Sequence, residues 1–482
     1  MPFPALDPWQ YRLGLALEGG CEVGHGFRLE TGPDLPVAVV EDAAGAEIGL
    51  LVGFPIDLAA RRLVEGRWRA PADPRRGAAL GVVWALGGRF LYLHRGAGGL
   101  EIHPDANAQV PCVFDARAGL IGSSAHALLD DAAYEARLDR PLFDALGVLG
   151  EGWFPGNLTA HRGLRRLYPN HVLSTADWSV RRHWPGPEAP GPADAPPPEA
   201  IVDEFTDLVQ AQLAALVAGP RRVAVALTAG LDSRSMLAMA RPFGDAIECV
   251  TVVAGDRHRT DSVIAGRIAA DLGIPHLKLP RVLATPEQQA LFLRRGGHCN
   301  GDANRLYHPS TWPLAERHVF VGGFGAEVAR AFFWRPGDGP DTRLGAEQMV
   351  QRMGLPRHPA LLEALRGREA DLPHGLDGYR RLDLLYIEER IAPWASVQFA
   401  SDPTLLRQNP MSTMRGVELM TLLPPDWKRE SRLGHEIVRR NWPELARYPI
   451  NSLGRVRDGL AKLQRAAQDP RVVLKKLRKI RS

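Results

Sequence analysis

The stretch Leu227-Thr228-Ala229-Gly230-Leu231-Asp232-Ser233-Arg234 decides the fold of the second half of the chain. A short β-branched run, Val223 to Leu227, precedes it, and an amphipathic stretch with Met236 and Leu237 follows. This order predicts a strand, a turn of small residues and a helix. Such a turn brings backbone N–H groups and the positive end of a helix to one point, where an anion can bind. The carboxylate of Asp232 fits there if a divalent cation bridges it to a polyphosphate.

The segments that follow predict a parallel sheet. Ile247 to Val253 reads as a second strand, and His276 to Leu279 as a third. Between them, apolar residues from Ile264 to Leu272 recur at helical spacing, and Gly273 lies where a helix would end. The alternation of strands and helices predicts an α/β fold with a doubly wound parallel sheet, whose ligand binds at the carboxyl ends of the strands.

The first turn resembles the pyrophosphate loop, Ser-Gly-Gly-x-Asp-Ser, of the ATP pyrophosphatases. It is most similar to the loop in the synthetase domain of asparagine synthetases and their relatives, the β-lactam synthetases and lasso-peptide cyclases. A Walker loop does not fit, because no Gly-Lys-Ser/Thr follows a four-residue spacer. Val321 to Val328 follows the strand candidate His318 to Val321 and resembles the Ser-Gly-x-Gly-x-Asp-Glu motif of the same family. Asp261 to Ala265 resembles its Asp-Glu-x-x-Ala segment, with Ser262 in place of the Glu.

The resemblance implies a sheet of the adenine-nucleotide α-hydrolase type with a helical C-terminal extension, and ATP and Mg²⁺ as cofactors. Asp232 and Glu327 would hold the metal, Glu327 standing where the family has an Asp. The backbone near Leu227 and Val253 would hold the adenine. The residues implied in binding ATP and pyrophosphate are Leu227, Thr228, Ala229, Gly230, Asp232, Ser233, Arg234, Val253, Gly323 and Gly325.

A proline-rich connector at 185–199 separates this half, a synthetase-like domain at 200–455, from residues 1–184. Residues 1–184 contain short strand-like runs such as Phe90 to Leu93. Arg182-His183-Trp184 resembles the Arg-Tyr-Trp that ends the glutamine-amidotransferase domain of asparagine synthetases, which implies an Ntn-type αββα sandwich. The nucleophile of that domain is a cysteine at position 2, where this chain has Pro2. The domain is therefore predicted to be degenerate and unable to hydrolyse glutamine.

The last third departs from the family at one important point. In the ligases a lysine near the end stabilises the adenylate or the tetrahedral intermediate, whereas Arg447 to Ser452 contains none. Arg447, Arg455 or Lys428 would be alternative sources of that charge. Tyr386 and Glu389 are candidates for an acid–base pair that deprotonates an amine. Residues 456–482 form a basic tail, which is interpreted as a solvated helix end.

Composition limits the class of protein. A chain of 482 residues with 45% hydrophobic residues is long enough for two domains with substantial cores. It has no apolar run long enough to span a membrane, and no signal peptide is recognised at its start. Four scattered cysteines fit neither a disulfide framework nor a zinc site, so a cytoplasmic location is expected. The net charge of +4 and the lack of an RNA-binding motif argue against a nucleic-acid partner.

These patterns predict an ATP-dependent carboxylate–amine ligase. It would adenylate the carboxylate of a small molecule or peptide, release pyrophosphate and form an amide with ammonia or a substrate amine, including an amine of the same molecule in a lactam or macrolactam synthetase. A second hypothesis is a catalytically degenerate nucleotide-binding scaffold that works with partner proteins of a biosynthetic pathway. A third joins adenylation to sulfur transfer onto RNA, against which the absence of a paired-cysteine motif counts.

Overall fold

The computed structural model describes residues 3–150, 152–186, 191, 194–253, 259–299 and 303–452. Several sequence predictions fall outside these ranges. They concern Pro2, Arg455, the tail at 456–482 and parts of the proline-rich connector.

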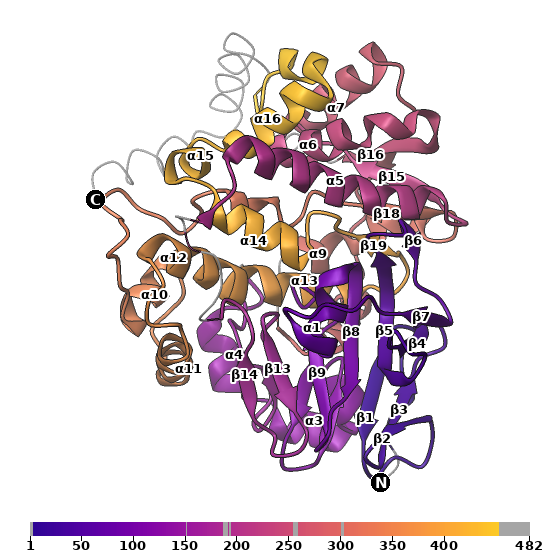
Figure 1. Cartoon of the computed structure of the whole chain (residues 1–482), viewed down its shortest axis with the longest axis vertical. Helices are drawn as coiled ribbons and strands as arrows, with labels where there is room; N and C mark the ends of the chain where they lie inside the picture. The colour runs from indigo at the N-terminus through magenta and orange to yellow at the C-terminus, as the bar shows by residue number, and fades with distance from the viewer. Residues whose placement is uncertain are drawn as a thin grey trace.

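Two sheets form the first half of the chain and lie in the lower part of Figure 1. One has six strands in the order β12-β10-β11-β1-β3-β2, and the other eight in the order β14-β13-β9-β8-β5-β4-β7 with β6 paired to β5. Among the described residues the pairs are antiparallel except β4 with β7. The strands are β1 (Tyr11–Gly14), β2 (Cys21–Gly24), β3 (Phe27–Thr31), β4 (Val37–Glu41), β5 (Glu47–Asp57), β6 (Arg62–Leu63), β7 (Arg67–Arg69), β8 (Leu86–Arg95), β9 (Leu100–Pro104), β10 (Val113–Asp115), β11 (Leu120–Gly122), β12 (Arg165–Arg166), β13 (His171–Ser174) and β14 (Val180–Arg182). The helices are α1 (Gly77–Ala85), α2 (Ala125–Leu128), α3 (Asp131–Arg137) and α4 (Arg140–Leu146).

The side chains of β8 show why the two sheets pack together. Leu91 and Leu93 belong to a buried core that also contains Tyr11 of β1, so both sheets contribute to it. The alternate residues Phe90 and Tyr92 belong to a second core, because successive side chains of a strand point to opposite faces. That second core continues into the second half of the chain. The strand predicted at Phe90 to Leu93 is confirmed, whereas the Ntn type of this half stays a prediction.

The second half is built on a parallel sheet of five strands in the order β17-β16-β15-β18-β19. The strands are β15 (Arg222–Ala226), β16 (Ile247–Val253), β17 (His276–Pro280), β18 (His318–Val321) and β19 (Arg407–Gln408). The connecting helices are α5 (Pro198–Val217), α6 (Leu231–Ala240), α7 (Arg259–Asp271), α8 (Pro286–Arg295) and α9 (Ala303–Tyr307), with 3₁₀ turns η2 (Arg241–Ala246), η4 (His308–Leu314) and η5 (Ala326–Ala329). The prediction of an α/β fold with a parallel sheet is confirmed.

Both faces of this sheet are covered. Val223 and Val225 of β15 share a core with residues of α5, α6 and α7, which lie in the upper part of Figure 1. Ala224 faces the other way and shares a core with Leu314 of η4 and with Leu405. Strands buried on both faces are typically continuous runs of apolar and β-branched residues, as these are.

The order of the strands reverses at β15. From β15 the chain passes to β16 and β17 on one side, whereas β18 and β19 lie on the other. The loops after β15 and β18 therefore leave the sheet next to each other, at the point where open α/β sheets bind ligands. The small-residue turn at 227–230 and the glycine-rich segment at 322–325 lie in these two loops.

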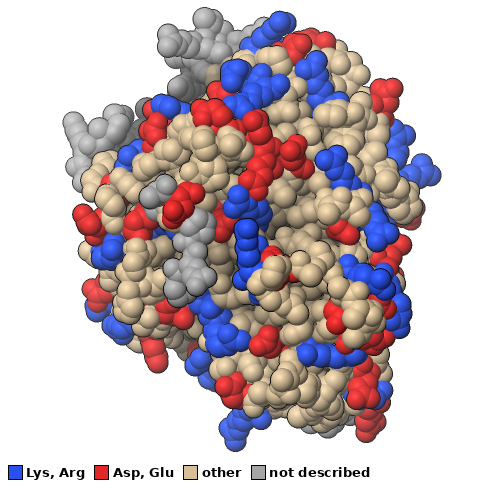
Figure 2. Space-filling view, in the orientation of Figure 1, with Lys and Arg blue, Asp and Glu red and all other residues tan. Residues whose placement is uncertain are grey.

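Helices complete the second half. They are α10 (Ala346–Met353), α11 (Pro359–Ala370), α12 (Gly378–Tyr386), α13 (Ala392–Ser401), α14 (Met414–Leu422), α15 (Pro425–Arg429) and α16 (Arg432–Asn441), with a π-helical turn η6 (Ile387–Ile391) and a 3₁₀ turn η7 (Pro443–Arg447). None of the helices in the described ranges combines the length and apolar character that a bilayer crossing requires. On the face shown in Figure 2, basic and acidic side chains are intermixed.

Candidate functional site

The loop after β15 is held by its own side chains. Ser233 Oγ accepts a hydrogen bond from the Thr228 N–H at 3.1 Å, and Thr228 Oγ1 accepts one from the Gly230 N–H at 3.1 Å. The Ala229 N–H donates to the carboxylate of Asp261 at 2.9 Å, which ties α7 to the loop. The N–H groups expected to cradle an anion at 228–230 are therefore engaged within the protein.

The next turn of the chain keeps the features of an anion site. Helix α6 starts at Leu231 with Gly230 as its N-cap, and no side chain caps it. The first N–H groups of a helix have no partner within the helix and form its positive end. Asp232 lies in this first turn. The start of α6, and not the backbone of 228–230, is thus the part of the loop whose N–H groups no side chain caps.

Asp232 forms an ion pair with Arg330, a residue that the sequence analysis did not single out. The side chains of Asp232 and Arg330 are 27% and 33% exposed, so the pair is open to ligands from solvent. Burial raises the pKa of Asp232, and the positive charge of Arg330 opposes this rise. Arg330 comes three residues after Glu327, a spacing that places two side chains on one side of a helical turn. That spacing is the signal by which the sequence could have indicated it.

Glu327 lies within electrostatic reach of the same pair. Burial and the charge of Asp232 both raise the pKa of Glu327. The Gly325 N–H, which donates to Glu327 Oε2 at 3.0 Å, and Arg330 act in the opposite direction. The structure thus brings the two predicted metal ligands into one site, from loops that follow different strands.

Two stacked aromatic rings, Phe332 and Tyr386, lie near these carboxylates. The pKa of Tyr386 is raised by burial and then by the negative charge of Glu327, with a smaller effect of Asp232. Its ring stacks on Phe332 with centroids 4.4 Å apart. Phe332 is 54% exposed, which is unusual for so large an apolar side chain and leaves one face of the ring available for contact.

Gly323 lies against Asp232, so a side chain at this position would push the two loops apart. A Cβ atom at Gly323 would lie 3.0 Å from the carbonyl carbon of Asp232 and 3.2 Å from its Cβ. We expect Gly323→Ala to weaken binding of Mg²⁺·ATP about tenfold, because the two carboxylates no longer keep their spacing. Isothermal titration with a non-hydrolysable ATP analogue measures this change. Gly375→Ala is the matched control, since a Cβ there meets nothing within 4 Å; equal affinities of the two variants would contradict the prediction.

Arg234 has a different position from the one expected. Its side chain is buried, and its guanidinium donates to the carbonyls of Leu445, Tyr448, Pro449 and Ala229. A guanidinium with four carbonyl acceptors is directed into the protein and not toward a phosphate. Arg234 instead holds the segment 445–449 against the loop.

The segment where the family has its lysine does lie on the loop. The N–H of Asn451 donates to the carbonyl of Ala229 at 3.0 Å. Arg447 is exposed on this segment. Lys428 is buried in an ion pair with Asp383 and lies beside Trp334, so its charge is already neutralised within the protein.

The two positions expected to contact adenine lie at strand ends. Leu227 is buried, and its carbonyl accepts a hydrogen bond from Thr251 Oγ1 at 2.7 Å. Val253 is 37% exposed, and its carbonyl accepts one from the Arg281 N–H at 3.1 Å. Gly325 has φ +99 and lies near Ser412, in the loop that carries Glu327.

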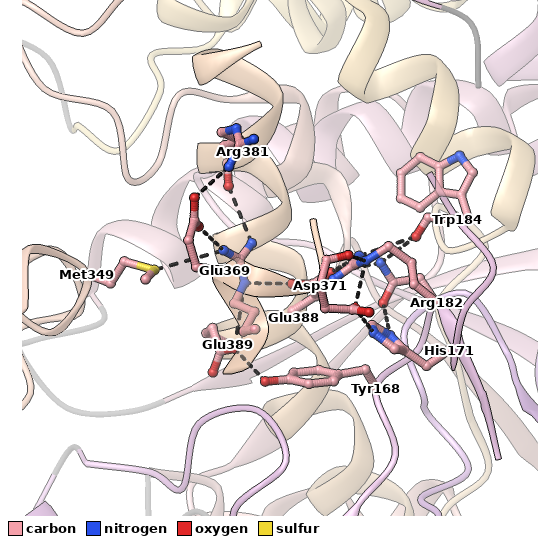
Figure 3. Close-up of polar contacts among 12 residues, drawn as sticks. Tyr168, His171, Arg182, Trp184, Met349, Glu369, Asp371, Arg381, Glu388 and Glu389 are labelled. Atoms are coloured by element: carbon pink, nitrogen blue, oxygen red, sulfur yellow. Dashed lines mark hydrogen bonds and ion pairs between the residues drawn. The ribbon is translucent and has the colours of Figure 1, made fainter. Parts of the chain in front are cut away.

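Tyr386 and Glu389 do not form the expected pair. Whereas the charges of Glu327 and Asp232 raise the pKa of Tyr386, Glu389 accepts a hydrogen bond from the Tyr168 hydroxyl at 2.8 Å (Figure 3). The indole of Trp153 donates to the Glu389 carbonyl at 2.6 Å. Tyr168 and Trp153 belong to the first half of the chain, so Glu389 joins the two halves of the chain instead of facing the loop site.

Burial raises the pKa of Glu389 to about 7, and Arg368 and the Tyr168 hydroxyl only partly oppose this. The folded protein therefore keeps this proton up to about pH 7, whereas the unfolded chain releases it near the ordinary value of 4.5. Stability from this group is present below pH 4.5 and is lost as the pH rises through 7. Glu389→Gln should remove this dependence, so the variant should gain up to about 3 kcal/mol over wild type between pH 4.5 and 8. Urea unfolding at both pH values measures this gain; the exposed Glu363→Gln is the control, and a constant difference would contradict the prediction.

A separate cavity of about 300 Å³ lies on the sheet face opposite to α6. Val252 of β16 and Phe320 of β18 form its floor, and Arg281, Asp402 and Arg407 supply charges. Asp402 is 3% exposed, and its Oδ2 accepts no hydrogen bond although Arg407 Nη2 lies 3.5 Å away. The cavity can therefore receive a ligand with both polar and apolar parts.

The residues at the loop site fit a divalent cation. Asp232 and Glu327 are carboxylates, the ligands that Mg²⁺ prefers, and their mutual charge effect favours a cation nearby. Among the described residues, no cluster of three or more His, Cys, Asp or Glu side chains is arranged to hold a metal. Mg²⁺ typically takes one or two carboxylates, and phosphate oxygens and water complete its shell.

No protein-family model matches this sequence, and no curated protein sequence matches it. Three solved structures show limited likeness: an NH₃-dependent NAD synthetase from Campylobacter jejuni (12% identity, 42% of this chain and 96% of that chain, TM-score 0.21), an NMN synthetase from Francisella tularensis (11%, 54% and 98%, TM-score 0.20) and the U34-tRNA thiolase NcsA from Methanococcus maripaludis (15%, 54% and 84%, TM-score 0.20). TM-scores this low carry no argument about this chain. The functional interpretation therefore rests on the residues of the site.

Proposed function

We propose that this protein is an ATP-dependent ligase that activates a carboxylate as its adenylate and joins it to an amine. The single observation that carries the proposal is the meeting of Asp232, Glu327 and Arg330 beside the uncapped start of α6. Two carboxylates and a guanidinium lie at the point where the strand order reverses. The carboxylates suit a divalent cation, and the guanidinium and the helix start suit a triphosphate. The resemblance of the loops after β15 and β18 to those of asparagine synthetases supports the same reaction.

The chemistry needs an activated acid because a free carboxylate is a poor electrophile. An oxygen of the substrate carboxylate attacks the α-phosphorus, the bond to the β-phosphate oxygen breaks, and pyrophosphate leaves with the electron pair. The amine then attacks the acyl carbon, AMP leaves, and the amine loses its proton. Asp232 and Glu327 would hold Mg²⁺, which supplies charge neutralisation on the phosphates.

The amine is proposed to be ammonia or a group on a substrate, and not one released from glutamine. Burial raises the pKa of the Cys112 and Cys249 thiols to about 12, so neither is a ready nucleophile. The first half of the chain, residues 1–184, is proposed to serve as a supporting domain that contacts the synthetase-like half through Tyr168 and Trp153.

The cavity beside β16 and β18 is proposed to hold part of the second substrate. It lies on the sheet that carries the loop site and contains both signs of charge, which suits an acid or amine with further polar groups. Its volume of about 300 Å³ is at the lower end of ligand pockets and therefore favours a small molecule or a single side chain.

ATP–pyrophosphate exchange tests the proposal. The full chain is incubated with Mg²⁺, ATP, labelled pyrophosphate and a panel of amino acids, dicarboxylic acids and peptides with free carboxyl groups. Label should enter ATP only when the correct acid is present. Failure to bind Mg²⁺ with a non-hydrolysable ATP analogue would refute the proposal.

A catalytically degenerate scaffold is the second candidate function. The ion pair between Asp232 and Arg330 and the self-bonded loop at 228–230 favour it, because both are complete without a nucleotide. A scaffold of this kind should bind the ATP analogue but show no exchange with any acid of the panel. Acid-dependent exchange would exclude it.

A further inference from the structure

Arg330 stands out because its charge lies where the reaction would develop charge. Its guanidinium pairs with Asp232, and its positive charge lowers the pKa of Glu327 and of Tyr386. Its Nε is buried and has no hydrogen-bond partner in the structure. The guanidinium of Arg330 thus has one nitrogen, Nη2, paired with Asp232 and another, Nε, whose N–H has no acceptor.

Two other cations near the loop are directed elsewhere, whereas Arg447 is exposed at the edge of the segment that lies on it. Arg234 is bound to four backbone carbonyls, and Lys428 is paired with Asp383. The segment Tyr448 to Asn451 lies on the loop but contains neither lysine nor arginine. Among the described residues, Arg330 is the cation that an ion pair joins to the acids of the loop site.

We propose that Arg330 is a catalytic residue that stabilises the pyrophosphate as it leaves. This inference rests on the proposed function. In the structure, Arg330 neutralises Asp232. If Asp232 held Mg²⁺ beside bound ATP, the guanidinium of Arg330 would be free to bind the phosphates. The electron pair of the broken bond moves to an oxygen of pyrophosphate, and the positive charge of Arg330 offsets the new negative charge.

The choice of arginine has a chemical consequence. A guanidinium stays charged at any physiological pH and binds phosphate through two parallel N–H groups. It can therefore stabilise the leaving pyrophosphate but cannot donate a proton to it. An acid-base task in the second half of the reaction then falls to another group or to the substrate.

A purely structural role for Arg330 makes different predictions. If the ion pair only holds the two loops together, its removal should lower stability and leave any folded protein with normal exchange. If Arg330 competes with metal for Asp232, its removal should also change metal affinity without nucleotide. The two roles are therefore separated by measuring exchange and metal binding on the same variants.

The experiment compares wild type, Arg330→Gln, Arg330→Lys and the exposed Arg335→Gln, which lies five residues further along the chain. Mn²⁺ alone is titrated against each protein and followed by electron paramagnetic resonance, and ATP–pyrophosphate exchange is measured separately. Arg330→Gln should bind Mn²⁺ at least about fivefold more tightly, because Asp232 is free. Its exchange rate should fall about 10²- to 10³-fold. Arg330→Lys should retain an intermediate rate, and Arg335→Gln should behave as wild type.

Exchange by Arg330→Gln within threefold of wild type would overturn the inference while leaving the proposed function intact. Should that variant not fold, Arg330→Met is measured in its place, and exchange within threefold of wild type by that variant would overturn the inference in the same way. A wild-type protein that neither binds nucleotide nor exchanges pyrophosphate refutes the proposed function itself. Independently of exchange, an unchanged Mn²⁺ affinity in a folded Arg330→Gln protein would refute the idea that Arg330 competes with metal for Asp232.

Discussion

Replacement of Asp232 by asparagine is expected to lower ATP–pyrophosphate exchange at least about 10³-fold, the largest effect on activity that we predict. The substitution keeps the shape of the side chain but removes its charge. It therefore takes away a proposed metal ligand and leaves the Arg330 guanidinium without its partner. Because Asp232 raises the pKa of Glu327, the substitution should also let Glu327 ionise more easily.

The control for this experiment is Asp245→Asn, which changes an exposed aspartate of η2. It should exchange pyrophosphate at the wild-type rate. The melting temperatures of both variants should be measured, so that a loss of folding is not taken for a loss of chemistry. A folded Asp232→Asn protein with full exchange activity would contradict the assignment of this carboxylate to the nucleotide site.

The strands of the second half were predictable because their burial leaves a simple pattern. β16 has the bounds predicted for it, Ile247–Val253, and β18 also agrees, since both are short apolar runs between polar turns. β15 starts and ends one residue earlier than predicted, because Leu227 is buried like a strand residue but belongs to the loop. The local pattern of apolar residues was therefore enough to predict the bounds of these strands to within one residue.

An acid–base pair of Tyr386 and Glu389 requires both side chains to lie on one face of a helix, and the structure shows why they do not. The π-helical turn η6 begins directly after Tyr386 and contains Glu389. A π-turn has more residues per turn than an α-helix, so it rotates the following side chains away from the face that an i, i+3 pair would share. Tyr386 then faces the loop site, while Glu389 faces Tyr168 of the first half. Sequence periodicity gives no sign of such a turn.

The partners of arginines were the other part that the sequence did not indicate. Arg234 lies in the loop motif but contacts residues more than two hundred positions away, and Arg330 reaches back to a residue 98 positions earlier. Such pairs depend on the folded arrangement of several loops. A single sequence shows that arginines are abundant but not which of them meet a carboxylate.

The second large effect is expected on stability, at the buried charges between the two halves of the chain (Figure 3). Glu388 is fully buried and accepts hydrogen bonds from Arg368 Nε at 2.7 Å, Arg182 Nη1 at 2.5 Å and Asn170 Nδ2 at 2.8 Å. Burial alone would raise the pKa of Glu388, but Arg182 and Arg368 outweigh it and hold the pKa at about 2. We expect Arg368→Met to lower the free energy of unfolding by about 3–5 kcal/mol, because it leaves Glu388 and Glu389 without their shared cation.

Urea unfolding at pH 7 measures this loss, and a second substitution identifies its cause. If the loss comes from an uncompensated buried charge, the double variant Arg368→Met/Glu388→Gln should recover most of it, since the remaining side chains are neutral or paired. The pH dependence gives an independent check. Because the lowered pKa of Glu388 stabilises the protein above 4.5 and this stability is lost as the pH falls toward 2, the difference between Arg368→Met and wild type should narrow over that window. A loss that stays the same in the double variant and at low pH would instead indicate that Arg368 stabilises the structure by packing, through contacts such as that with Met349 at 3.9 Å.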